Sequence, residues 1–345
     1  MMMRAIVLRE FGGPQRLQVE QVPIPDIAAT DVLVRVRAVS INRTLDLAVR
    51  AGRFMVPVKL PLVPGVDPAG EVTQIGAAVA NFKAGDRVVV TGIRCGECRA
   101  CVEGDRADCQ GGTMIGVQRW GGAAEYIAVP AASVQTIPDE LDFATAVYTA
   151  RHGGLAMNIL RTKARLKAEE SVLITGAAGA LGTSLVQVGA ALGAHVVAAA
   201  GNLERAQACC ALGASAAIDY RSSDLTSAAM AANKGRGFDV VVDTTGDADI
   251  WTRAFASLGH RGRLVSMAAS GDGHVDVNLR QLYARRQSII GAAGSNADDV
   301  GAAFDLARTG RLRAVIARKF PLDAYAQAHE LLERGSVTGK IIIEP

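Results

Sequence analysis

A strand, a glycine-rich turn and a helix follow one another between residues 172 and 192, and this succession constrains the fold more than any other feature. Apolar strands at 172–175, 196–200, 240–243, 263–267 and 288–291 alternate from there with helical patterns such as 180–192 and 203–212. Strands that are apolar throughout and lie between amphipathic helices are typical of a parallel sheet covered on both faces. The sequence therefore predicts a doubly wound α/β domain.

The part before this domain has a different pattern. Short strands separated by Pro-rich and Gly-rich turns are predicted at 4–8, 32–38, 70–75, 87–91 and 124–129, with a single clear helix at 44–51. After the α/β part come helices at 298–308 and 324–333 and a last strand at 340–343, which we expect to rejoin the first domain. We therefore expect a β-rich domain made of residues 1–151 and 296–345, and a nucleotide-binding type of domain at 152–295.

Composition excludes several classes of protein. Half of the 345 residues are hydrophobic and 21% are charged, which is the composition of a globular chain and not of a disordered one. Lys and Arg exceed Asp and Glu by only three, without a basic block, so nucleic acid is not an expected partner. The chain has no apolar run near the ~18 residues of a membrane span and no apolar leader. We expect a cytoplasmic protein without a membrane partner.

The turn between the first α/β strand and its helix predicts a dinucleotide site. Gly179 and Gly182 stand at the second and third positions of a dinucleotide fingerprint, and Ala177 takes the first. Glycines here let the backbone approach a pyrophosphate and let helix and strand pack closely, while the helix N-terminus offers N–H donors. The alternative is a glycine turn without a ligand. The predicted loop residues are Gly176, Ala177, Ala178, Gly179, Ala180, Leu181 and Gly182.

The end of the second α/β strand indicates which dinucleotide binds. A carboxylate usually stands about 20 residues after the glycine loop, where it binds the ribose 2′-hydroxyl. No Asp or Glu stands at the strand end, residues 200–202, while Asn202 and Arg205 lie there and just beyond, which favours NADPH. Tyr220 is a further contact to the phosphate or the adenine, and the alternative for Arg205 is a solvated helix residue. Cofactor contacts are also expected from Thr245, Gly246, Met267 and Lys340.

Four of the six cysteines lie within fifteen positions. Their spacing is C-x2-C-x2-C-x7-C, from Cys95 through Cys98 and Cys101 to Cys109. Four thiolates this close in sequence can surround one Zn²⁺, and a closed four-sulfur shell leaves no open position for a substrate. We therefore predict one structural zinc ion, with disulfides or free thiols as the alternatives. Cys209 and Cys210 are interpreted as buried helix residues.

This order of features resembles the medium-chain dehydrogenase/reductase superfamily over nearly the whole chain. Residues 200–205 and 218–221 are most similar to its NADPH-dependent quinone reductase and enoyl reductase branch. The resemblance implies a GroES-like β-rich catalytic domain, a Rossmann domain and a homodimer or homotetramer. The segments that carry the resemblance are 64–70, 82–88, 121–126, 212–214 and 339–342.

The chain departs from the zinc alcohol dehydrogenases of that superfamily at the catalytic metal. Where the resemblance implies a first Cys ligand, either Asn42 or Arg43 faces the site, and the position of the His ligand is Val66. Near the third ligand position stand Arg151 and His152. Asp67 and His152 alone would make a poor zinc site, so the sequence does not predict a catalytic zinc.

Without a Lewis acid, hydride transfer needs other groups to stabilise the developing oxyanion. Asn42, Arg43 and His152 are the candidate donors, and His152 is also a candidate proton donor. Asp46 is grouped with them as an architectural hydrogen-bonding residue of the same loop. The alternatives are that Asn42 only shapes the turn, that Arg43 is solvated and that His152 is a bonded core residue.

Three functions are compatible with these features. The first is an NADPH-dependent reductase of an activated C=C bond or a quinone, acting on a small molecule with zinc only in the cysteine lobe. The second is an alcohol or aldehyde dehydrogenase with an atypical site. The third, of another class, is an NADPH-binding sensor with little turnover.

Overall fold

The computed structural model describes residues 1–335 and 337–345, and the chain forms two compact units. Unit 1 comprises Met1–Arg151 and Ala314–Pro345, and unit 2 comprises His152–Arg313. Among the described residues, no helix has both the length and the apolar character that a membrane span requires.

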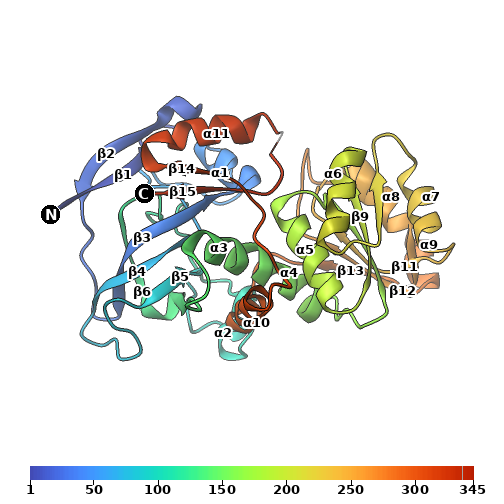
Figure 1. Ribbon diagram of the computed structural model, residues 1–345, viewed down its shortest axis with the longest axis horizontal. Helices are drawn as coiled ribbons and strands as arrows, with labels where there is room; N and C mark the ends of the chain where they lie inside the picture. Colours follow the sequence, from blue (N-terminus) through green and yellow to red (C-terminus); the bar gives the residue numbers. More distant parts are fainter. Residues whose placement is uncertain (336) are drawn as a thin grey trace. The chain divides into compact units, whose positions relative to one another are not determined.

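Unit 1 is built on a seven-stranded sheet that combines strands from residues 31–136 with the two C-terminal strands (Figure 1). A separate antiparallel pair, β1 (Met2–Leu8) and β2 (Leu17–Pro23), precedes it. The sheet strands run in the order β14 (Ile316–Pro321), β15 (Lys340–Glu344), β3 (Asp31–Ile41), β4 (Pro68–Ile75), β5 (Arg87–Val90) and β7 (Val134–Thr136), and β6 (Tyr126–Pro130) pairs with β3.

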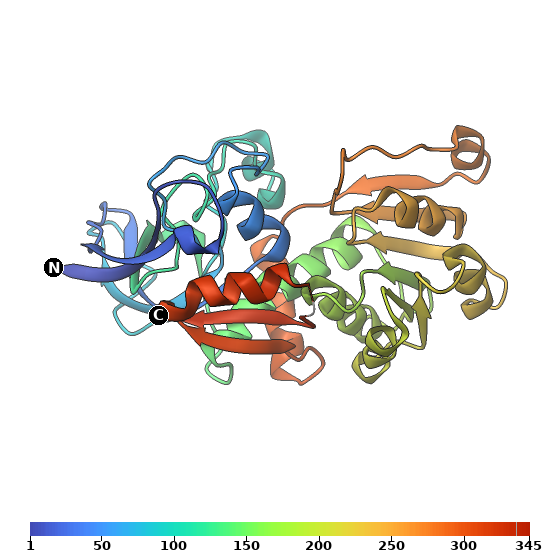
Figure 2. The ribbon, with the colours of Figure 1, turned by 90° about the horizontal axis from the view of Figure 1, so that it is seen from above.

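The C-terminal segment completes unit 1, as the sequence predicts. β15 pairs antiparallel with β3, with Ile341 opposite Ile41, and α11 (Tyr325–Glu333) lies along β14 and β15 in both views (Figures 1 and 2). Apolar side chains from the early and late strands share one core cluster, which includes Ile6, Val34 and Ile343. The remaining helices of unit 1 are α1 (Arg43–Arg50), α2 (Arg99–Val102) and α3 (Phe143–Tyr148).

Unit 2 is the predicted doubly wound domain. Its six strands are all parallel, and their order is that of a dinucleotide-binding sheet, in which the first strand lies at the centre. The strands in spatial order are β10 (Ala216–Asp219), β9 (His195–Ala200), β8 (Ser171–Thr175), β11 (Phe238–Asp243), β12 (Leu258–Ser266) and β13 (Ser288–Gly291).

Helices cover both faces of this sheet because parallel connections are right-handed and the chain reverses direction after β10. The predicted helix at 203–212 is α-helical only to Ala208 and then tightens into a 3₁₀ turn that ends at Leu212. The α-helices of unit 2 are α4 (Gly154–Met157), α5 (Ala180–Ala191), α6 (Leu203–Ala208), α7 (Leu225–Ala232), α8 (Ala248–Ala256), α9 (Leu279–Ala284) and α10 (Ala297–Arg308).

Unit 2 extends to Arg313, beyond the return at residue 296 that the sequence suggests. Helix α10 stays with unit 2 because a buried carboxylate connects it to the segment after α4. Asp299 accepts hydrogen bonds from Asn158 Nδ2 at 2.8 Å and from Thr162 Oγ1 at 2.9 Å, and it forms an ion pair with Arg161. Apolar periodicity alone does not show to which sheet a helix belongs.

The close packing of α5 against β8 generates a first prediction. A Cβ atom on Gly182 would meet the Gly176 carbonyl oxygen and would lie 2.6 Å from Ala177 Cα, both of which are backbone atoms that cannot rotate away. We expect Gly182→Val to lower the free energy of unfolding by about 1–3 kcal/mol, as measured by denaturant unfolding. The control is Gly291→Val, because a Cβ there has no neighbour within 4 Å. Equal stability of the two variants would contradict the prediction.

Candidate functional site

The glycine loop has the geometry that a bound pyrophosphate needs. Gly176 has a left-handed φ of +69°, and a Cβ there would collide with Thr244 Oγ1. Gly179 is the N-cap residue of α5 and offers no side chain. A Cβ atom added to Gly179 would have one neighbour within 4 Å among the described residues, the Gly176 carbonyl oxygen at 3.3 Å. A ligand can therefore approach the first turn of α5 closely, where the helix dipole favours an anion. The loop residues fit a dinucleotide.

A buried carboxylate organises the loop next to the glycine turn. Asp243, at the end of β11, accepts hydrogen bonds from Thr175 Oγ1 at 2.5 Å, Thr245 Oγ1 at 2.7 Å and the Gly246 amide at 2.9 Å. The Met267 amide donates to the Asp243 carbonyl at 3.3 Å. The predicted cofactor residues Thr245, Gly246 and Met267 therefore follow adjacent strands at the carboxyl edge of the sheet, where such folds bind their ligands. The role of Asp243 was not predicted.

The ends of β9 and β10 present two arginines and a tyrosine. Asn202 caps α6, since its Oδ1 accepts from the Arg205 amide at 2.8 Å, whereas Arg205 Nε is buried without an acceptor in the described part of the chain. A Cβ on Gly201 would lie 3.4 Å from both Tyr220 OH and Arg221 Nε, so these two side chains border the strand end. Sequence reasoning missed Arg221.

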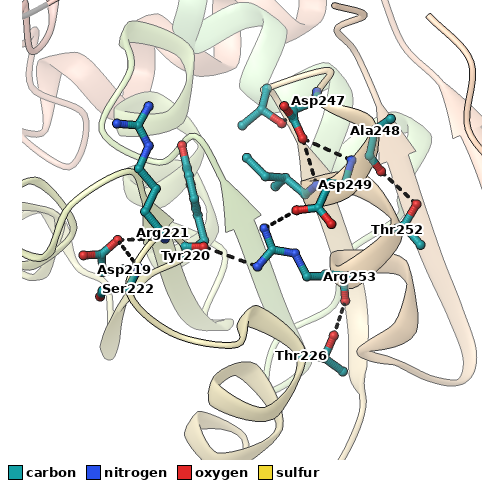
Figure 3. A network of polar contacts seen from close by, with 12 residues as sticks. Asp219, Tyr220, Arg221, Ser222, Thr226, Asp247, Ala248, Asp249, Thr252 and Arg253 are labelled. Atoms are coloured by element: carbon teal, nitrogen blue, oxygen red, sulfur yellow. Dashed lines mark hydrogen bonds and ion pairs between the residues drawn. The ribbon is translucent and has the colours of Figure 1, made fainter.

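Figure 3 shows why Arg221 rather than its neighbour Arg253 is available to a ligand. Arg253 is neutralised by Asp249 at 2.5 Å and also donates to the Tyr220 carbonyl at 3.3 Å. The Arg221 amide donates to Asp219 Oδ1 at 2.9 Å, which fixes the turn, but its guanidinium forms no ion pair among the described residues. Partial burial raises the pKa of Tyr220, so this hydroxyl stays protonated at neutral pH.

A second polar cluster lies in unit 1, around Asn42. Asn42 Nδ2 donates to Asp67 Oδ2 at 2.8 Å, and its backbone amide donates to Asp46 Oδ2 at 2.5 Å. Ser40 Oγ also donates to Asp67 Oδ2 at 2.8 Å. Lys340 Nζ donates to Asn42 Oδ1 at 2.5 Å, so the amide of Asn42 is held from both sides.

Burial shifts the two ionisable groups nearest Asn42 in opposite directions. Asp46 and Lys340 are 2% and 3% exposed. Loss of water raises the pKa of Asp46 to about 6 and lowers the pKa of Lys340 to about 8. Lys340, expected at the cofactor, is therefore a buried partner of Asn42, and Asp46 has the architectural bonding that was expected of it.

The structure separates Asn42 from its neighbour Arg43. Asn42 is 9% exposed inside the cluster, whereas Arg43 is exposed and its guanidinium lies near Gly335. His152 is the first residue of unit 2, where it is buried. Of the three predicted oxyanion donors, the cluster of unit 1 therefore contains only Asn42.

The Asn42 cluster does not fit a zinc ion. Val66 offers no ligand atom, and one oxygen of Asp67 already accepts two hydrogen bonds. A divalent cation at Asp67 would also face the positive charges of Lys340 and Arg151, whose Nε lies 3.5 Å from Asp67 Oδ1. Zinc sites use three or four N, S or O ligands without a competing cation.

The four cysteines of the lobe do fit a metal ion. Their sulfur atoms all lie within 4.8 Å of one another, and Cys95 Sγ is 3.5 Å from Cys109 Sγ. Burial and the neighbouring thiols raise the pKa of Cys101 to about 11, so full ionisation of the set requires a cation. A tetrahedral four-sulfur shell meets that requirement with Zn²⁺.

This geometry predicts the effect of removing one thiol. We expect Cys98→Ser to lower the zinc content of dialysed protein from one ion per chain and to lower the midpoint of thermal unfolding, because the shell is no longer closed. Elemental mass spectrometry and calorimetry measure the two quantities. Cys210→Ser is the control, since Cys210 lies outside the lobe and is exposed; of the two cysteines expected to be buried, only Cys209 is. Unchanged zinc content in Cys98→Ser would exclude Cys98 as a ligand.

Comparisons with known proteins identify the family of the chain. Residues 28–139 match the family described as alcohol dehydrogenase GroES-like domain, and residues 180–309 match the family described as zinc-binding dehydrogenase. An NAD-dependent alcohol dehydrogenase of Sulfolobus acidocaldarius is 31% identical over 99% of both chains. A mouse quinone oxidoreductase is 28% identical over 99% of this chain and 98% of its own.

A solved structure of an NAD-dependent alcohol dehydrogenase covers 99% of this chain and 100% of its own, with a TM-score of 0.93 and 30% identity. This similarity spans both units, and the two matched family models together take in the cysteine lobe and the helix that follows the glycine turn. The chain therefore belongs to the medium-chain dehydrogenase/reductase superfamily and is one of its oxidoreductases.

Proposed function

We propose that the protein is an NADPH-dependent reductase of an activated C=C bond or a quinone, with zinc confined to the cysteine lobe. The single observation that carries the proposal is the Asn42 cluster, in which the positions of two expected zinc ligands are Asn42 and Val66 and a buried lysine holds the Asn42 amide. Two relatives whose names describe quinone oxidoreductases, from mouse and from Escherichia coli, support the same class.

The preference for NADPH follows from charge at the end of β9. Residues 200–202 offer no carboxylate to bind a 2′-hydroxyl, and a 2′-phosphate would meet Arg205, Arg221 and Tyr220 instead. Guanidinium groups bind phosphate through charge-assisted hydrogen bonds. Arg205 Nε is buried without an acceptor, so a phosphate oxygen would remove an unfavourable unpaired donor.

The chemistry then divides between the two units. A bound reduced dinucleotide supplies hydride. In unit 1, Lys340 holds Asn42 in one orientation, and its positive charge favours the development of negative charge on a substrate oxygen nearby. A zinc ion would polarise an alcohol or aldehyde oxygen directly, and the Asn42 cluster lacks the ligands to hold one.

The reaction is tested by product analysis. With 4-phenylbut-3-en-2-one and NADPH, we expect the saturated ketone to form in equal amount to NADP⁺, as measured by mass spectrometry and absorbance. Reduction of a quinone at the expense of NADPH is the parallel assay. Formation of the allylic alcohol, or turnover only with simple alcohols and NAD⁺, would favour the alcohol dehydrogenase that the Sulfolobus relative suggests. Binding of NADPH without turnover of any of these compounds would favour a sensor.

The cofactor preference is tested separately by binding. We expect Arg205→Ala and Arg221→Ala each to weaken NADPH binding by about 1–3 kcal/mol and to change NADH binding little, because only NADPH carries the 2′-phosphate. Isothermal titration calorimetry measures both affinities. Arg236→Ala, at an exposed arginine of the same unit, is the control. An equal loss for NADPH and NADH would refute a phosphate contact.

A further inference from the structure

Arg151 is a half-buried cation that the functions argued above do not use. It lies on a long helical segment in which α3 passes into a π-helical stretch at Thr149–Gly153, then into α4. The wider π turn rotates the side chains that follow it relative to an ordinary helix, and such turns occur frequently at functional sites. The local backbone therefore presents Arg151 in a direction that an uninterrupted α3 would not give.

Asp67 orients this side chain. The Asp67 Oδ2 atom is fully occupied by donors from Ser40 and Asn42, both at 2.8 Å, which leaves Oδ1 to face Arg151 Nε at 3.5 Å. The Asp67 side chain is 10% exposed and the Arg151 side chain is 33% exposed. The pair is therefore partly shielded from water, so its attraction exceeds that of a surface ion pair.

Arg151 nevertheless keeps donors for another group. Its Nε is buried and has no hydrogen-bond acceptor among residues 1–335 and 337–345, and over the same residues its terminal nitrogens form no ion pair. A guanidinium has five N–H donors in a planar fork, and one ion pair at 3.5 Å does not satisfy them. A negatively charged oxygen atom would accept hydrogen bonds from these N–H groups. Lys340, which is bonded to Asn42, would not repel such an oxygen because Lys340 is itself positively charged.

We infer that Arg151 is a catalytic residue whose guanidinium binds the carbonyl oxygen of an α,β-unsaturated carbonyl substrate, and that Asp67 is its positioning residue. This inference rests on the proposed function and names the group that replaces a Lewis acid in it.

In the proposed step, hydride transfer from NADPH reduces the C=C bond of the substrate. The C–H bond at C4 of NADPH breaks, a C–H bond forms at the β-carbon of the substrate, and the C=C electron pair moves to give an enolate whose oxygen is bound by Arg151. A water molecule then donates a proton to the α-carbon, which forms the second C–H bond and restores the carbonyl, and the hydroxide that remains takes up a proton from the solvent. NADPH is oxidised to NADP⁺ and the C=C bond is reduced.

Arg151→Gln tests the catalytic role. We expect kcat/KM for 4-phenylbut-3-en-2-one to fall about 10²–10³-fold, the loss typical of one oxyanion donor, while the dissociation constant of NADPH stays unchanged. Arg37→Gln is the matched control, because Arg37 is a similarly exposed arginine of unit 1 that pairs with Glu71 at 2.7 Å. Free guanidinium ion should restore part of the turnover of Arg151→Ala and should not accelerate the wild-type enzyme.

A binding measurement gives a readout that does not depend on turnover. Cinnamate carries a carboxylate where the enolate oxygen would form, and cinnamamide is its neutral counterpart. We expect calorimetry to show that Arg151→Gln weakens cinnamate at least tenfold and cinnamamide much less, and that Asp67→Asn weakens cinnamate to an intermediate degree.

The outcomes separate the two proposals. If the wild-type enzyme reduces the enone and Arg151→Gln matches Arg37→Gln in turnover and in cinnamate affinity, the inference about Arg151 is overturned and the proposed function stands. If the wild-type enzyme reduces no enone, the proposed function fails for this substrate class and the catalytic role fails with it. Loss of cinnamate binding in Arg151→Gln alone, with turnover intact, also overturns the catalytic role.

Discussion

The antiparallel pairing of β15 with β3 is the constraint on which the rest of the candidate active site depends. Ile341 lies opposite Ile41, so the residues just outside this pair, Lys340 and Asn42, meet although 298 positions separate them. Both strands are mostly buried, and burial of one face of a sheet strongly specifies the register of its strands. Lys340, near the C-terminal end of the sequence, therefore completes a cluster that Ser40 and Asn42 begin.

A buried ionic cluster is stable only when its members satisfy one another. Asp67 accepts hydrogen bonds from the side chains of Ser40 and Asn42, and Lys340 donates to the side-chain oxygen of Asn42. Removing one partner would leave an unpaired group in a dry environment, which is strongly destabilising, whereas the complete set fixes each side chain in one orientation. The cluster therefore provides a rigid arrangement of charge whether or not it adds net stability.

The parts of the structure that the sequence predicted are those set by short-range patterns. Apolar strands and the turn at Gly176–Gly182 predicted unit 2, and the spacing from Cys95 to Cys109 predicted a set of thiols that could meet. Contacts set by tertiary structure were not predictable in this way. Arg221 follows Tyr220 directly, but only the pairing of β10 with β9 shows that both border Gly201. The π-helical turn that contains Arg151 has no distinctive sequence signal, because it differs from an α-helix only in that its hydrogen bonds join residues five positions apart instead of four.

Chemical specificity in this fold follows from the charge placed in unit 1. The glycine loop and the strand ends of unit 2 form a dinucleotide site whatever substrate is reduced, because its geometry depends on backbone packing at Gly176 and Gly182. A metal ion and a guanidinium both stabilise an oxyanion, but a metal needs several anionic or neutral ligands, whereas Arg151 needs only one carboxylate to orient it. In the function we propose, a guanidinium thus takes the place of the metal as the electrophile in the same fold.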